Sequence, residues 1–145
     1  MSKFFKHILL FYLLISFFNV SISSDKFFDQ GVKLFKDKKY EDAKFMFERS
    51  LVFNPKDSNS YLYLAKIYNH KEDKKKEEKN LEATLLIETK NEEAILMLMR
   101  IGLEKSNYSK VKDLSKTFIN VCSKLCNENE KILETLSNIE PKNES

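Results

Sequence analysis

The stretch SDKFFDQGVKLFKDKKYEDAKFMFERSLVFNPKD, residues 24–57, decides the fold of this chain. Its apolar residues recur three or four positions apart on both sides of a charged break at residues 37–39, as two helices with one buried stripe each require. Asn54 and Pro55 end the second helix, because proline cannot continue a helix and disfavours helical angles in the residue before it. Residues 24–57 therefore predict a helical hairpin.

The same pattern returns at a spacing of 34 residues, which indicates a repeat architecture. At that spacing Phe27 coincides with Tyr61 and Ile95, and Tyr40 coincides with Tyr108 two spacings on. We expect three hairpins, with repeats over residues 24–57, 58–91 and 92–125. The predicted helices cover residues 24–37, 40–53, 58–71, 74–88, 92–105 and 108–123.

Two helix starts have capping signals. Ser58 is placed to accept a hydrogen bond from a free backbone N–H in the first turn of the third helix. Asn127 and Glu130 have the spacing of a capping box, with Asn in place of the usual Ser or Thr. An apolar stripe follows them at Ile132, Leu133, Leu136 and Ile139. We therefore expect a seventh helix at about residues 127–140 that caps the array.

These units resemble the tetratricopeptide repeat (TPR) family. The first unit matches the family pattern at Gly31, Tyr40, Ala43, Phe47, Ser50, Leu51 and Pro55. The second keeps Tyr61, Leu64, Ala65, Tyr68 and Leu81, and the third keeps Leu98, Tyr108 and Val111, with a bulky Met99 where a small residue is expected. The resemblance implies an all-α fold, an α-solenoid of about three TPR-like hairpins plus a C-terminal capping helix.

The second unit departs from the family pattern. Lys74 stands where an aromatic residue is expected, and Glu77 where a buried alanine is expected. The stretch from Lys71 to Lys79 is almost wholly charged. We therefore expect either a longer turn in the second hairpin or a late start of its second helix.

The beginning of the chain has the layout of a signal peptide. Lys3 and Lys6 precede an apolar run from Ile8 to Phe18 that only Ser16 interrupts, and small serines follow at positions 21 and 23. The run is shorter than the roughly 18 residues that a spanning helix needs. We predict a signal peptide over residues 1–23, cleavage after Ser23, a TPR-like domain over residues 24–145, and a periplasmic or secreted protein. A retained membrane anchor is the alternative.

Composition argues against catalysis and against nucleic-acid binding. The chain has 2 Gly and 2 His, which leaves nothing for a glycine-rich phosphate loop, and His70 is the only histidine after the leader. We expect no enzyme activity, no cofactor and no metal site. Loss of residues 1–23 removes two lysines and no acid, so the net charge falls from +3 to +1. A net charge this small gives little electrostatic attraction for a nucleic-acid backbone.

Cys122 and Cys126 are the only cysteines. An exported protein permits a disulfide between them, provided that the helix ends between the two residues. The alternative is two thiols packed against the last helix. Two thiolates without a nearby histidine fall short of the four ligands that a structural zinc takes.

The first helix has a second apolar face beside its core residues. In proteins that this chain resembles, the first helix of each repeat lines a concave groove that holds a partner's peptide or helix. The resemblance therefore implies a groove lined by Phe28, Val32, Phe35, Leu62, Lys66, Asn69, Leu96, Arg100 and Leu103. Lys66 and Arg100 would orient acidic groups of the partner. Phe28, Val32 and Tyr63 stand where some relatives place a clamp for a terminal carboxylate, so that mode of binding is not expected.

Together these features predict a non-catalytic scaffold or adaptor that binds an apolar or amphipathic segment of another protein. The resemblance suggests envelope-complex assembly, cell division or cytochrome maturation in the periplasm. One alternative is a self-assembling structural protein, because exposed apolar faces also serve self-association. Another is a small redox protein that uses Cys122 and Cys126.

Overall fold

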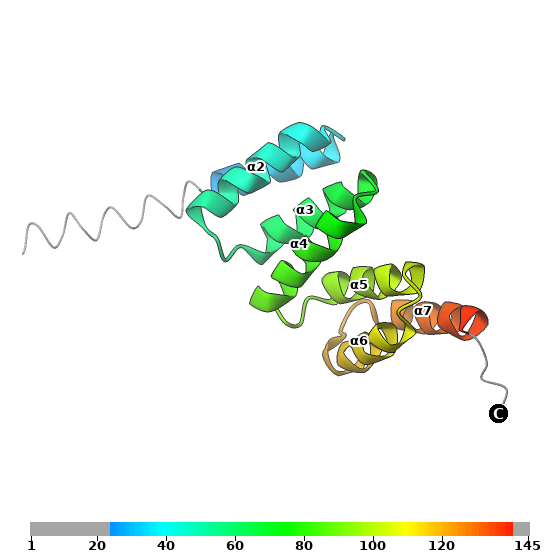
Figure 1. Ribbon diagram of the computed structural model, residues 1–145. Coiled ribbons are helices and arrows are strands. Elements are labelled where there is room, and N and C mark those ends of the chain that lie inside the picture. The colour runs from blue at the N-terminus through cyan, green and yellow to red at the C-terminus, as the bar shows by residue number, and fades with distance from the viewer. Residues whose placement is uncertain (1–23, 141–145) are drawn as a thin grey trace, which may run out of the picture. The chain divides into compact units, whose positions relative to one another are not determined.

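The computed structural model describes residues 24–140, in which seven helices are joined by short turns and no strand occurs (Figure 1). The first helix covers residues 24–36. The others are α2 (Tyr40–Phe53), α3 (Ser58–His70), α4 (Lys74–Ile87), α5 (Glu92–Glu104), α6 (Tyr108–Val121) and α7 (Cys126–Ile139). The all-α prediction is confirmed, and every predicted helix agrees with the observed one to within two residues at each end. The predicted signal peptide and its cleavage point lie outside the described residues.

The turn within each hairpin has the same backbone conformation. Lys38, Glu72 and Ser106 have φ angles of 59°, 57° and 54°, and they lie 34 residues apart. In the first and third turns, the residue after the left-handed one donates its N–H to a carbonyl of the preceding helix, five residues earlier. The distance is 2.9 Å from Lys39 to Leu34 and 2.8 Å from Asn107 to Gly102. Left-handed residues of this kind commonly end helices. The period is thus visible in the backbone as well as in the side chains.

The chain divides into two compact units, residues up to Leu64 and residues from Ala65 onward. In the first unit the helix over residues 24–36 packs closely on α2. Gly31 faces the ring of Phe47, and a Cβ on this glycine would lie only 2.7 Å from that ring. The hydroxyls of Ser24 and Ser50 lie 3.2 Å apart at the other end of the same interface. Small residues therefore set the close approach of these two helices.

The second unit is built around α5, which packs against α4, α6 and α7. Eight of its residues are buried, so it is apolar around most of its circumference. Its core cluster consists of Ile95, Leu96, Met99, Val111, Phe118, Ile132 and Leu136. Gly102 gives the close approach to α6, since a Cβ there would lie 2.7 Å from Val111. The last two core residues come from α7, which caps this core as predicted.

The charged stretch at residues 71–79 does not lengthen the turn, so that expectation is wrong. The second helix of this hairpin begins at Lys74, and Asp73 caps it by accepting the N–H of Lys76 over 3.1 Å. Glu77 is 2% exposed. Its Oε1 accepts a hydrogen bond of 2.9 Å from Asn69, and its Oε2 lies 3.3 Å from Lys74 Nζ. The chain thus fills an alanine position with a carboxylate that has polar partners.

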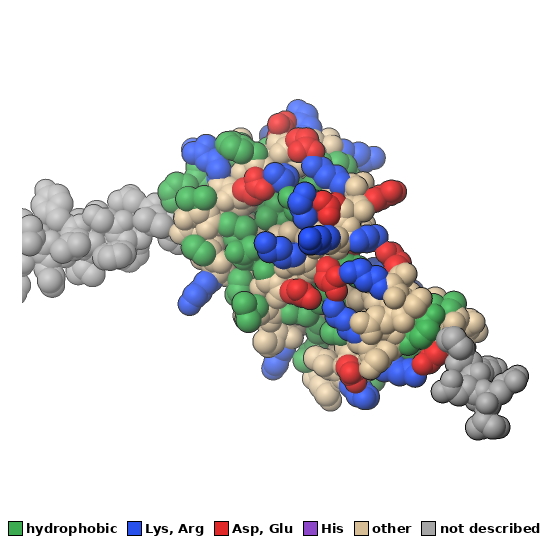
Figure 2. Space-filling view, viewed as in Figure 1, with side chains coloured by type: hydrophobic (Ala, Val, Ile, Leu, Met, Phe, Trp, Pro, Cys, Tyr) green, Lys and Arg blue, Asp and Glu red, His purple; other side chains and the backbone are tan. Residues whose placement is uncertain are grey.

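The remaining charges of this stretch form ion pairs with neighbouring helices. Lys74 Nζ lies 3.0 Å from Glu104 on α5, and Glu78 pairs with Lys105 and, at 2.6 Å, with Lys110 on α6. Hydrogen bonds from these two lysines lower the pKa of Glu78. Acidic and basic side chains are interspersed on the face drawn in Figure 2. The charge run is therefore a surface network that links three helices.

The predicted cap of the third helix is also corrected. Ser58 is itself the first helical residue, and Asp57 provides the cap. Asp57 accepts hydrogen bonds from the N–H of Asn59 over 3.1 Å and from the hydroxyl of Ser60 over 2.5 Å. The helix begins where it was predicted, but an aspartate caps it, because a carboxylate can accept two such bonds at once.

Candidate functional site: a hollow beside a disulfide-closed loop

In the first unit, the predicted groove residues pack within the unit instead of forming an open surface. The Phe28 ring lies 5.8 Å from the rings of both Phe47 and Tyr63, measured between centroids. The Phe35 ring lies 5.2 Å from Tyr63 and packs edge-on against it. Val32 is half-buried. The second apolar face of the first helix is therefore covered by aromatic rings from α2 and α3.

Leu62, at the corresponding position of α3, is only 6% exposed. Burial of this kind leaves little of the side chain for a partner. The predicted contact residues Phe28, Phe35 and Leu62 thus belong mainly to packing. Phe28 and Phe35 lie in the aromatic cluster centred on Tyr63, and contact of these three residues with a partner stays a prediction.

In the second unit, the predicted groove residues divide into core residues and ion-pair residues. Leu96 is 2% exposed and belongs to the core cluster, and Leu103 packs against that cluster. Asn69 donates to the buried Glu77 carboxylate. Lys66 pairs with Glu93 over 2.8 Å. The Lys66 ammonium, expected to orient a partner's acid, therefore already has a carboxylate of this chain beside it.

Arg100 has the same kind of partner. Its guanidinium lies 3.4 Å from Glu128 in the first turn of α7, and its side chain is 53% exposed. Glu128 also accepts a hydrogen bond of 2.6 Å from Lys131. These cations, Lys131 foremost, lower the pKa of Glu128 and keep its carboxyl ionised. Both predicted groove cations thus pair with acids of this chain.

These residues surround a hollow of about 370 Å³ that lies within the second unit. Its lining consists of Glu93, Leu96, Arg100, Leu125 and Glu128. The half-buried Leu125 supplies apolar surface, Leu96 is only 2% exposed beneath it, and the three charged side chains give a net charge of −1. The hollow therefore has the mixed character that suits one apolar side chain on a charged polypeptide.

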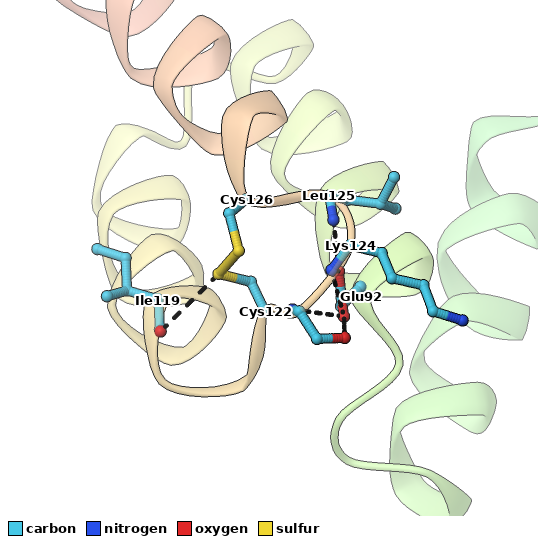
Figure 3. The surroundings of a disulfide bond; sticks show 7 residues. Glu92, Ile119, Cys122, Lys124, Leu125 and Cys126 are labelled. Atoms are coloured by element: carbon cyan, nitrogen blue, oxygen red, sulfur yellow. Dashed lines mark hydrogen bonds between the residues drawn. A yellow bond between two sulfur atoms is a disulfide. The ribbon is translucent and has the colours of Figure 1, made fainter.

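One wall of the hollow comes from the loop between α6 and α7. Cys122, which follows the last residue of α6, is joined by a disulfide to Cys126, the first residue of α7. Their Cα atoms lie 5.3 Å apart. Figure 3 shows the loop curling between the two cysteines, with Leu125 directly before the bridge. The helix is interrupted at the bridge, because α6 ends at Val121 and α7 begins at Cys126, and such a break is what the sequence required for a disulfide.

Glu92, at the start of α5, holds the same loop (Figure 3). Its carboxylate accepts hydrogen bonds from the Ser123 hydroxyl over 2.7 Å and from the Ser123 and Leu125 amides over 2.8 Å each. It also accepts one from the Lys124 amide over 3.1 Å. These bonds lower the pKa of Glu92 from its ordinary 4.5 to about 2, and the Ser123 hydroxyl contributes most. The carboxylate is therefore ionised at neutral pH.

The capping box predicted at the start of α7 is wrong, because Glu92 from α5 binds the loop amides in its place. The helix begins at Cys126, its N-cap is Leu125, and no side chain of the loop caps it. The Glu92 carboxylate, 33 residues before Leu125, binds the loop amides instead. Sequence reasoning missed Glu92 because acids are common in the first turn of a helix, and its partner loop is distant in the chain.

Other chemistry has little support in the part of the chain that the structure describes. Within residues 24–140 no three His, Cys, Asp or Glu side chains gather as a metal site would require. His70 is exposed at the end of α3. Among the same residues, no helix is both long enough and apolar enough to cross a bilayer.

Comparison with solved structures identifies the fold as that of a TPR domain. The first TPR domain of Spaghetti (RPAP3), solved with an HSP90 peptide, matches with a TM-score of 0.69 at 16% identity, over 81% of this chain and 98% of that one. The Arabidopsis OM64 TPR domain matches with a TM-score of 0.72 at 15% identity, over 82% and 98%. The Yersinia enterocolitica type III secretion chaperone SycD, in complex with a peptide of the translocator YopD, matches with a TM-score of 0.72 at 14% identity, over 81% and 94%.

No family model matches the sequence, and comparison with curated proteins finds no significant match. At identities of 14–16% the structural likeness establishes the fold and nothing finer. Function must therefore be argued from this chain's own residues.

Proposed function

We propose that this protein is a non-catalytic interaction module that binds a polypeptide segment of another protein, with one apolar side chain of that segment seated in the hollow. The observation that carries the proposal is the apolar surface of the half-buried Leu125, set among Glu93, Arg100 and Glu128 over the buried Leu96. Two of the similar structures support it, because RPAP3 was solved with an HSP90 peptide and SycD with a YopD peptide.

The charges around the hollow define the chemistry of the partner. Lys66 and Arg100 are already paired with Glu93 and Glu128, so they offer an incoming acid little net attraction. The hollow's own lining has two carboxylates against one guanidinium. Electrostatic complementarity therefore favours a segment in which the apolar anchor stands next to a lysine or arginine. The acidic segment expected from the sequence is less favourable.

The compartment is part of this proposal. The basic start, apolar run and small residues before Ser24 support export to the periplasm, where an adaptor could serve envelope-complex assembly, cell division or cytochrome maturation. Export also supports the disulfide, because bridges persist in oxidising compartments. Cleavage after Ser23 is tested by N-terminal sequencing of the protein from its native host. Sequencing that begins at Met1 would contradict it.

The binding mode is tested by a photo-reactive amino acid at position 100, on the rim of the hollow, in the protein expressed in its native host. A second copy with the probe at Lys116, a 77% exposed residue of α6, controls for chance encounters. We expect a covalent product with another protein at position 100 alone. The cross-linked peptide of that protein should contain an apolar residue next to a basic one.

Charge variants then separate specific from adventitious capture. Glu93→Lys reverses a charge in the hollow and should weaken binding of the synthetic partner peptide to the purified protein. Glu82→Lys makes the same change on α4, away from the hollow, and should leave binding unchanged. Equal products at both probe positions, or equal effects of the two charge variants, would contradict the proposal.

Self-association is the second candidate, and exposed apolar residues favour it. Val52 is 76% exposed and Leu86 is 85% exposed, and they occupy the same position one period apart, near the ends of α2 and α4. Large exposed apolar side chains at repeated positions suit an interface between copies. Sedimentation should then give a dimer that Leu86→Lys dissociates. A monomer at all concentrations would exclude this candidate.

A further inference from the structure

The loop that lines the hollow is held by a disulfide and by hydrogen bonds to the Glu92 carboxylate. The disulfide joins Cys122 to Cys126. The Glu92 carboxylate accepts hydrogen bonds from the amides of residues 123–125, which lie between the two cysteines. Both the disulfide and these hydrogen bonds act on the segment that positions Leu125. The wall of the hollow therefore depends on the disulfide as well as on packing.

The bridge is open to chemical attack. Cys126 is exposed and Cys122 is half-buried. A thiolate can therefore approach the bridge from solvent, as thiol–disulfide exchange requires. By contrast, Ile132 and Leu136 anchor the middle of α7 in the core cluster. Opening of the bridge should accordingly loosen the first turn of α7 and leave the rest of the helix in place.

The first turn of α7 is the part that builds the hollow. Leu125 and Glu128 both line it, and the N–H of Glu128 donates to the carbonyl of Leu125 over 2.9 Å. If residues 122–125 become free to move, Leu125 leaves the wall and Glu128 loses its fixed place beside Arg100. The hollow would then lose an apolar wall and one of its two acids.

We propose that the Cys122–Cys126 disulfide is a redox control on the hollow: the oxidised protein presents the binding site, and reduction by a dithiol dismantles it. This inference rests on the proposed function, since it concerns the same site. In this proposal the two cysteines control binding, and they do not carry out a redox reaction on a substrate.

The chemical step is an ordinary exchange. One thiolate of the dithiol attacks Cys126 or Cys122, which breaks the S–S bond and forms a mixed disulfide. The second thiol of the dithiol then attacks that mixed disulfide, which frees the protein sulfur and releases the reagent as a cyclic disulfide. Two electrons and two protons end on Cys122 and Cys126 as thiols. Oxidation by a second disulfide reverses the step.

The first test is hydrogen exchange of the full mature protein, oxidised and after reduction with dithiothreitol. We expect exchange of the amides of residues 123–128 to rise about tenfold on reduction, because a closed loop of this kind restricts local opening. Exchange in the buried middle of α5 should not change. The Cys122→Ser/Cys126→Ser double variant should exchange as the reduced protein does, with or without dithiothreitol.

The second test measures the binding site itself. With the photo-reactive probe at position 100, the yield of partner product should fall at least about fivefold in the double serine variant. Unchanged exchange on reduction, or an unchanged yield despite faster exchange, would overturn the redox inference. Absence of any product in the wild-type cysteine background would instead overturn the proposed function, which the exchange measurement does not touch.

Discussion

The first hairpin (residues 24–53) and the third (residues 92–121) each contain a glycine at which the two helices approach closely, but at different positions. In the first, Gly31 faces Phe47, a fully buried aromatic ring. In the third, the position equivalent to Gly31 holds Met99, which is also fully buried. Close approach moves to Gly102, which faces Val111.

The fold therefore requires a pair of complementary helix surfaces, and the family pattern describes only one way to build them. Val111 stands where the first hairpin has Ala43, so the third hairpin adds bulk on α6 and removes it from α5 at Gly102. Interiors are close-packed, so a larger residue on one helix needs a smaller one opposite it. The third hairpin looks weak by resemblance and is well packed nonetheless.

Removal of the ring that fills each hairpin should have the largest effect. Phe47 in the first hairpin and Phe118 in the third are both fully buried. Phe47→Ala or Phe118→Ala should each lower the free energy of unfolding by about 3–5 kcal/mol, from lost transfer energy and a cavity. Urea unfolding followed by circular dichroism measures this. A loss below about 1 kcal/mol would show that the ring is not in the core.

Alanine in place of each glycine tests the comparison more sharply. A Cβ at Gly31 or Gly102 would lie 2.7 Å from a buried side chain. Gly31→Ala and Gly102→Ala should therefore each cost about 1–3 kcal/mol, although alanine is the better helix former by about 1 kcal/mol.

The matched rescue uses the facing residue. Val111→Ala should offset most of the cost of Gly102→Ala, so the double variant should be more stable than the sum of the single effects predicts. Phe47→Ala should do the same for Gly31→Ala. If either glycine variant is more stable than the wild type, the account of close approach fails for that hairpin.

In the third hairpin, the Glu92 carboxylate holds the loop at residues 123–125, and this attachment depends on pH. The pKa of Glu92 is about 2 in the folded protein, below its ordinary 4.5. Because the folded-state pKa is the lower one, the stabilisation is complete well above pH 4.5 and is lost as the pH falls toward 2.

Glu92→Gln should accordingly lower the melting temperature at pH 7, and the difference from the wild type should shrink between about pH 5 and pH 2. Glu82→Gln, which also removes one carboxylate of this unit, serves as the control. A difference that stays constant over this range would show that the Glu92 charge does not hold the loop.

The smallest effect concerns the turns, which the two hairpins share. Lys38 and Ser106 have φ angles of 59° and 54°, a region that glycine adopts without the steric cost of a Cβ. Lys38→Gly and Ser106→Gly should each add about 0.5–1 kcal/mol to the free energy of unfolding. Lys33→Gly, inside a helix, should instead cost about 1 kcal/mol. Destabilisation by both turn variants would contradict the shared geometry.

The fold was predictable because its signals are local. Apolar spacing, the break at residues 37–39 and the proline at position 55 all act within a few residues, and they placed every described helix. The hollow and the attachment of Glu92 to the loop depend on contacts between distant segments. Neither Tyr63 over Phe35 nor Glu92 on the loop leaves a sequence signal, because side-chain type alone does not reveal a partner 30 residues away.

For the same reason the candidate site was only half predicted. Leu96 and Arg100 do line the hollow, because the 34-residue period projects them onto one face of α5. Leu125 and Glu128 were not foreseen, because α7 was assigned only a capping role. The longer turn or late start expected at residues 71–79 was wrong because the charged side chains there pair with α5 and α6.

A paired cross-linking measurement in the native host tests most directly that the hollow, and not the exposed end of α2, meets the partner. One protein has the photo-reactive residue at position 100 and the other has it at Val52, 76% exposed near the end of α2. We predict a product with a different protein from position 100 and none from position 52. Products between two copies of this chain from position 52, with none from position 100, would contradict the account.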